Sequence, residues 1–161
     1  MPPFAQSVRA RPVYAENASL GRRIDGVAFT GSGCEVLAAL EAETGVKGIS
    51  LLESVVNRLL VKKGADWTSA ILSEYLGLHD DSAGTFTLLW DRATAQLVSH
   101  GSIFQSASSP TAALLAHIRT ADEFKGLGLG TLVTEEVTAA AFRQGAERVV
   151  LATNDKLHRV D

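Results

Sequence analysis

The chain has 161 residues, of which 46% are hydrophobic, and a formal net charge of −3. This length suits one domain with a real core, and the charge provides no basic field for nucleic acid. No apolar run approaches the ~20 residues of a membrane helix, and the first residues lack a signal-peptide pattern. We therefore expect a soluble, cytoplasmic protein with neither a nucleic-acid nor a membrane partner.

Cysteine and histidine give no indication of a disulfide or a metal site. Cys34 is the single cysteine, which excludes an internal disulfide, and we expect it to be a buried, inert residue. His79, His100 and His158 show no metal-ligand spacing with each other or with Cys34. We therefore expect no metal.

The N-terminal segment predicts one strand followed by a loop. Residues 7–14 have strand composition, and Pro12 restricts such a strand to the edge or the end of a sheet. Residues 15–33 are polar and contain glycine without a clear hydrophobic period, so we predict mostly loop there.

Helices are predicted next. Residues 34–44 are rich in strong helix formers and stop at Gly45. Residues 49–63 carry an apolar stripe at helical spacing, and Asp66 is a suitable N-cap for a third helix over residues 67–76.

The second half of the chain predicts four strands. Residues 85–90 and 95–104 have strand composition and are joined by a plausible turn at residues 91–94. Residues 112–118 form an apolar run long enough for a buried strand, and residues 148–153 are short and β-branched enough for another.

A glycine loop lies between the last two of these strands, running from Lys125 to Gly130 as Lys-Gly-Leu-Gly-Leu-Gly. The segment after it has helical spacing up to a plausible stop at Gly145. Glycines admit backbone conformations closed to other residues and remove side chains that would keep a ligand away. The first amides of a helix lack internal acceptors and carry partial positive charge, so this helix start is a candidate phosphate or pyrophosphate site. A tight loop that only lets helix and strand pack closely is the alternative.

Two other glycine-loop folds fit less well. A dinucleotide-binding loop has a third glycine where Thr131 stands, and an acidic residue about 20 positions further on, where Asp155 is tolerably placed. An S-adenosylmethionine methyltransferase could use Gly126, Gly128 and Gly130. Both folds need several strand–helix units after the loop, and too few residues remain for them.

The segment from Thr120 to Gly130 resembles the acyl-CoA signature of the GCN5-related N-acetyltransferases, the GNAT family. That signature is a strand ending in Val, a short polar stretch with an aromatic residue, and Arg/Gln-x-x-Gly-x-Gly/Ala opening a helix. Phe124 matches the aromatic residue, and Gly128 and Gly130 match the glycines. Lys125 replaces Arg/Gln and Thr120 replaces Val, and both departures are mild because the loop contacts in this family are mainly backbone.

The resemblance implies an α/β fold, a GNAT-like mixed sheet flanked by helices, in a single domain over residues 1–161. Residues 85–154 would form the acyl-CoA-binding core, and residues 25–84 a helical N-terminal region on the acceptor side. The co-substrate would be acetyl-CoA, with its pyrophosphate on loop amides and its pantetheine arm along the end of the central strand. The binding residues implied are Ile118, Arg119, Thr120, Lys125, Gly126, Leu127, Gly128, Leu129, Gly130 and Thr131.

The sequence identifies no catalytic residue. Bases on the central strand in this family lie at positions matching Leu114 or Ala116, which are apolar here. His117 titrates near neutrality, but strand alternation places it on the face opposite Thr120 unless a bulge intervenes. A hydrogen-bonded core histidine is the alternative for His117, and strand amides near Thr120 could stabilise a carbonyl oxygen.

The family continues after its strand at residues 148–153 with a helix, which often carries a tyrosine as general acid, and with two more strands. This sequence reaches Asp161 without them, so we expect a fragment, a homo-oligomer, completion by a partner strand, or lost catalysis. The implied function is transfer of an acyl group from acetyl-CoA to a small-molecule or peptide amine by direct attack in a ternary complex. A non-catalytic acyl-CoA-binding or interaction module is the alternative.

Overall fold

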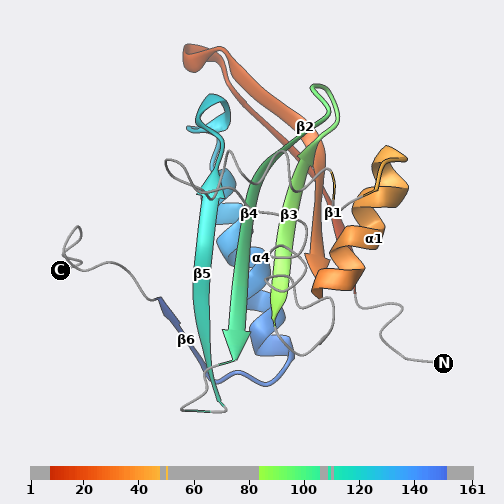
Figure 1. The fold of residues 1–161 in the computed structure, drawn as a ribbon. Helices are drawn as coiled ribbons and strands as arrows, with labels where there is room; N and C mark the ends of the chain where they lie inside the picture. Colours follow the sequence, from red (N-terminus) through yellow and green to blue (C-terminus); the bar gives the residue numbers. More distant parts are fainter. Residues whose placement is uncertain (1–7, 48–49, 51–83, 106–108, 110, 152–161) are drawn as a thin grey trace, which may run out of the picture.

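The computed structural model describes residues 8–47, 50, 84–105, 109 and 111–151. Its elements are β1 (Arg9–Asn17), η2 (Ala18–Leu20), β2 (Arg22–Gly31), α1 (Gly33–Thr44), β3 (Thr85–Asp91), β4 (Gln96–Gln105), β5 (Ala112–Thr120), η3 (Asp122–Phe124), α4 (Leu129–Arg143) and β6 (Arg148–Leu151), where η marks a single 3-10 turn. The six strands form one sheet in chain order (Figure 1). Successive strands from β1 to β5 pair antiparallel with one another. Strands β5 and β6 pair parallel and are connected through α4. The predicted mixed sheet flanked by helices is confirmed.

The two helices cover opposite faces of this sheet. Gly31 and Gly101 pair with Phe86 and Thr87, which are consecutive on β3 and therefore point to opposite faces. A Cβ at Gly31 would meet the side chain of an α1 residue, whereas a Cβ at Gly101 would meet one of α4. Figure 1 shows α4 passing behind β4 and β5. Strand β3 lies between the two layers, which is why all of its residues are buried.

Helix α1 begins and ends at residues that cap helices. The hydroxyl of Ser32 accepts a hydrogen bond from the Glu35 N–H, and the Glu35 carboxylate accepts one from the Ser32 N–H, a reciprocal capping box. At the other end, Gly45 has a φ of 74° and donates its N–H to the carbonyl of Glu41. The helix predicted over residues 34–44 is confirmed.

The pairing of β4 with β5 changes register at Gly101. On one side of this glycine Ser102 pairs with Ala116, and on the other side His100 pairs with Arg119, so two β5 residues stand opposite one β4 residue. Such a β-bulge bends the strand and reverses which face the following side chains occupy. The central strand is therefore interrupted near its carboxyl end.

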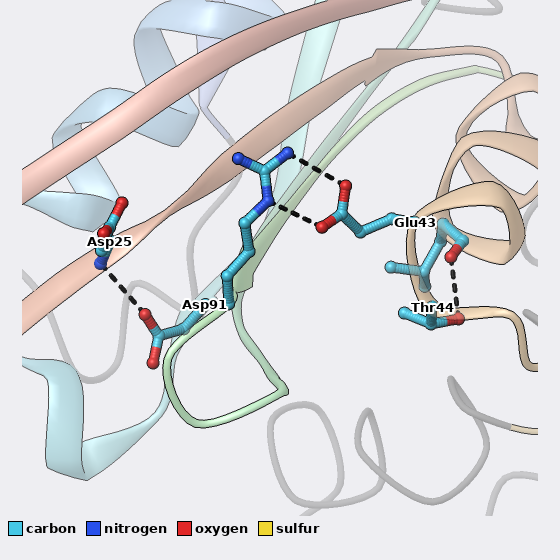
Figure 2. Close-up of polar contacts among 6 residues, drawn as sticks. Asp25, Glu43, Thr44 and Asp91 are labelled. Carbon is cyan, nitrogen blue, oxygen red and sulfur yellow. Dashed lines mark hydrogen bonds and ion pairs between the residues drawn. The ribbon is translucent and has the colours of Figure 1, made fainter.

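Side chains at the β3–β4 turn connect it to β2 and to α1 (Figure 2). Asp91 is only 1% exposed, and its carboxylate accepts a hydrogen bond from the Asp25 N–H at 3.0 Å. Arg92 donates two hydrogen bonds to the carboxylate of Glu43, at 2.7 and 3.0 Å. The bond from Arg92 lowers the pKa of Glu43 below its ordinary value. These contacts fix the end of α1 against the sheet.

The structure confirms the four strands predicted in the second half, which lie in β3, β4, β5 and β6. The edge position inferred from Pro12 is also confirmed, because β1 is the first strand of the sheet. The helix predicted over residues 67–76 lies outside the described residues, as does the one over residues 49–63 apart from residue 50.

Two predictions are wrong. The loop expected over residues 15–33 contains the end of β1 and the whole of β2, so the region expected to be helical begins with a strand. Gly26 is one of the residues that led to the loop prediction. A Cβ at this position would collide with the backbone of Trp90, so the glycine permits close strand pairing. Cys34 is exposed rather than buried, because it is near the start of α1 while Val36 and Leu37 face the core.

No helix among the described residues is long and apolar enough to span a bilayer. Within the same part of the chain, no three His, Cys, Asp or Glu residues are grouped so that they could hold a metal ion.

Candidate functional site

The glycine loop turns the chain from the end of β5 into α4. Strand β5 ends at Thr120, the turn η3 follows, and Gly128 is the N-cap of the helix. Gly126 and Gly128 have φ values of 87° and 78°, in the left-handed region that favours glycine. The loop conformation therefore depends on glycine at these two positions.

The start of α4 presents backbone donors without a capping side chain. The first intrahelical hydrogen bond runs from the Leu132 N–H to the Gly128 carbonyl at 3.0 Å. The N–H groups of Leu129, Gly130 and Thr131 come before that bond and have no acceptor within the helix. The first turn also contains no acidic residue. Together with the positive end of the helix dipole, these amides form an arrangement that suits an anion.

Open space adjoins two of the glycines. Among the described residues, a Cβ at Gly128 would have no atom within 4 Å, and one at Gly130 would meet only Thr120 Oγ1, at 3.8 Å. Gly128 is explained by its backbone angle. Gly130 is not among the described glycines that have a positive φ. Neither the backbone conformation nor packing against described residues therefore requires a glycine there. This position therefore differs from Gly126, where a Cβ would meet the side chain of Leu20.

The Lys125 side chain is engaged within the protein. Its Nζ lies 2.9 Å from Oδ1 of Asp122, and both side chains are exposed. The hydrogen bond from Lys125 lowers the pKa of the Asp122 carboxyl group. Because this carboxylate offsets the lysine charge, the backbone amides are the more direct positive groups of the loop.

The tip of the β1–β2 hairpin contacts the glycine loop. Asn17 Nδ2 donates to the Gly126 carbonyl at 3.0 Å, and Arg22 Nη1 donates to the Lys125 carbonyl at 2.6 Å. A Cβ at Gly126 would lie 2.5 Å from Cδ1 of Leu20. Figure 1 shows the hairpin reaching across to the end of β5. Asn17 and Arg22 were not predicted as part of this site, because nothing local in the sequence indicates a contact over more than a hundred residues.

The bulge places the end of β5 beside the start of α4. Ser99 pairs with Thr120, and their hydroxyl oxygens lie 2.9 Å apart on the face that α4 covers. Ile118 reaches the same face, since a Cβ on Gly101 would collide with its Cδ1. Arg119 is exposed and pairs with His100, so its side chain is on the other face. Of the predicted strand residues, Ile118 and Thr120 therefore adjoin the helix start, and Arg119 does not.

The two β5 positions at which a general base would be expected remain apolar in the part of the chain that the structure describes. Leu114 and Ala116, at the positions where a base would be expected, pair with Phe104 and Ser102. The backbone of His117 lies in the bulge that the sequence analysis left open.

A family model and several solved structures that resemble this chain all belong to acetyltransferases. The model of the acetyltransferase (GNAT) family matches residues 52–160. A GNAT family acetyltransferase from Staphylococcus aureus subsp. aureus has a TM-score of 0.52 at 11% identity, over 96% of this chain and 92% of that chain. An aminoglycoside acetyltransferase from an uncultured soil metagenomic sample has a TM-score of 0.52 at 12% identity, over 83% of this chain and 91% of that chain. Glucosamine-6-phosphate N-acetyltransferase from Arabidopsis thaliana has a TM-score of 0.50 at 14% identity, over 92% and 84%. A search among curated proteins found no match.

These structural similarities establish the fold. The mostly antiparallel sheet also differs from the parallel, doubly wound sheet of the dinucleotide-binding fold. The dinucleotide-loop alternative is therefore excluded.

Proposed function

Because the chain belongs to the GNAT family of acetyltransferases, whose model matches more than half of it, we propose that it is an acetyl-CoA-dependent N-acetyltransferase. The observation that carries the proposal is the start of α4, where uncapped amides adjoin open space at Gly130. An anionic ligand that approaches a backbone closely fits such a place. The diphosphate of CoA is a ligand of that kind.

The proposed binding residues follow the path from β5 into α4. The amides from Gly126 to Thr131 hold the diphosphate, and the chain from Ile118 to Thr120 runs along the pantetheine arm. The bound thioester supplies an activated acyl group. The β5 bulge places backbone groups outside the regular ladder, and an N–H there suits a carbonyl oxygen that gains negative charge.

The proposed reaction is direct transfer in a ternary complex. The acceptor nitrogen forms a bond to the acyl carbon and the carbon–sulfur bond breaks. The proton that the acceptor nitrogen gives up passes through solvent to the CoA thiolate, which leaves as the free thiol. The acceptor is a small-molecule or peptide amine.

One observation favours a second candidate, a non-catalytic acyl-CoA-binding module. Leu114 and Ala116 cannot accept a proton, and they occupy the β5 positions at which related enzymes carry a base. In this candidate the glycine loop still binds CoA, but no acyl transfer follows.

Ligand binding and turnover test the two candidates separately. We expect CoA and acetyl-CoA to raise the melting temperature, because a ligand that binds only the native state stabilises it by mass action, and NAD and S-adenosylmethionine to have no effect. Free thiol release from acetyl-CoA with a panel of amines then measures catalysis. Binding without turnover on any amine supports the second candidate, and stabilisation by NAD or S-adenosylmethionine but not by CoA contradicts both.

A further inference from the structure

We propose that Asn17 and Arg22, at the tip of the β1–β2 hairpin, are positioning residues that set the direction of the loop amides for the diphosphate. This inference rests on the proposed function, because it concerns how the same loop binds its anionic ligand. Neither residue is part of the glycine motif. Both reach it only through the fold.

The direction of the loop amides follows from the geometry of the peptide unit. In a trans peptide the carbonyl of one residue and the N–H of the next point in opposite directions within one plane. The Lys125 carbonyl is bound by Arg22 and the Gly126 carbonyl by Asn17. The N–H groups of Gly126 and Leu127 are therefore turned away from the hairpin.

Because the loop contains glycine, its peptide units need side-chain contacts to hold them in one orientation. Gly126 has a φ of 87°, and a residue without a side chain can rotate its peptide units at little steric cost. Two consecutive carbonyls held by side chains remove that freedom before a ligand arrives. Preorganised donors bind an anion more tightly because less ordering occurs on binding.

The Asn17 side chain is itself held in one orientation. Its Oδ1 accepts from the Leu20 N–H at 3.2 Å and from the Ser19 hydroxyl at 2.8 Å. The amide nitrogen Nδ2 is then directed at the Gly126 carbonyl. The Asn17 oxygen thus caps the hairpin turn, and the Asn17 nitrogen binds the glycine loop.

This division suggests a specific substitution. Asn17→Ser keeps a side-chain oxygen that can cap the turn but removes the donor to Gly126. It changes no charge, so a loss of affinity would not come from weaker long-range attraction of an anion. Arg22→Gln removes the donor to Lys125 together with one positive charge. Arg23→Gln, at the exposed neighbouring position on β2, is its matched control for charge.

Comparing two ligands, one with and one without the diphosphate, isolates the contribution of the diphosphate to binding. Isothermal titration compares CoA with pantetheine, which lacks the phosphates. We expect Asn17→Ser and Arg22→Gln each to weaken CoA binding about tenfold, the size of a lost hydrogen bond in a charged site. Binding of pantetheine, measured relative to wild type, should not change, and Arg23→Gln should bind CoA within about twofold of wild type. Arg22→Lys, which keeps a charged donor, should recover part of the loss.

The outcomes separate this inference from the proposed function. If wild-type protein does not bind CoA, both are wrong. If wild type binds CoA and both hairpin variants keep its affinity, only the positioning role is wrong. Equal losses for CoA and pantetheine would indicate a general structural effect and would also contradict it. Should either variant fold poorly, the amide chemical shifts of Gly126 and Leu127 in the other variant remain a direct readout, and unchanged shifts would count against the proposal.

Discussion

The side chain of Ile118 occupies the space into which a Cβ on Gly101 would project. Val133 Cγ1 of α4 lies 2.6 Å from the same point. The β5 bulge is opposite this glycine, so the extra residue of β5 is accommodated by the missing side chain on β4. The end of the central strand and the start of α4 are thereby packed together through one glycine.

We therefore expect Gly101→Ala to destabilise the fold by about 1–3 kcal/mol, the usual cost of an added methyl group in a filled core. Urea unfolding monitored by circular dichroism measures this. Gly130→Ala is the matched control, because the same methyl group would enter open space there. Similar midpoints for both variants would show that Ile118 moves aside at little cost.

The elements with local signals were predictable from the sequence. The glycine that ends α1, the strand composition of β3 and β4, and the order of β5, glycine loop, α4 and β6 all follow from short-range patterns. Strand β2 was missed because its polar residues and Gly26 are typical of a loop. The reason for that glycine, the backbone of Trp90, lies in another strand.

The candidate site was predictable in part for the same reason. Its backbone donors follow from the glycine spacing and the helix start, and the structure brings Gly130 next to Thr120 as the motif suggests. The hairpin contacts from Asn17 and Arg22 depend on tertiary structure alone. The bulge was considered as a possibility, but its place opposite Gly101 is a property of strand pairing, which sequence periodicity does not contain.

A second prediction concerns the pair formed by Arg11 of the edge strand and Glu136 of α4. The Nη1–Oε2 distance is 2.7 Å, and the Glu136 side chain is only 11% exposed while that of Arg11 is 46% exposed. Arg11→Ala should therefore cost about 1–3 kcal/mol, because it leaves a largely buried carboxylate without this donor. The double variant with Glu136→Gln should be less destabilised than the sum of the single variants. Urea unfolding of all four proteins completes the cycle, and strictly additive changes would contradict the coupling.

A third prediction uses the pH dependence of the Arg92–Glu43 pair. Its hydrogen bonds lower the folded-state pKa of Glu43 below the ordinary value of 4.5. Its contribution to stability is therefore complete above that value and is lost as the pH falls through the folded pKa. The side chains are 53% and 20% exposed, so Glu43→Gln should cost only about 0.2–1 kcal/mol at pH 7. The difference from wild type should shrink as the pH falls below 4.5 and should shrink in 1 M salt, and a constant difference across pH would exclude the ion pair as its cause.

The last prediction tests whether the glycine at the helix start serves the ligand. Gly130→Ala adds a methyl group where the protein leaves room, at a position inside α4, and alanine favours helix more than glycine does. Its stability should therefore equal or exceed that of wild type, and it should still bind CoA, because the acyl-CoA signature admits alanine at this position. Gly130→Val should lower CoA affinity at least tenfold, because its larger side chain closes the backbone to approach. Gly128→Ala provides the contrast, since its φ of 78° makes any side chain cost about 1–2 kcal/mol of stability. Thermal unfolding and CoA titration on the three variants separate the two effects. A Gly130→Val protein that binds CoA like wild type would mean that the diphosphate does not approach this turn of the helix.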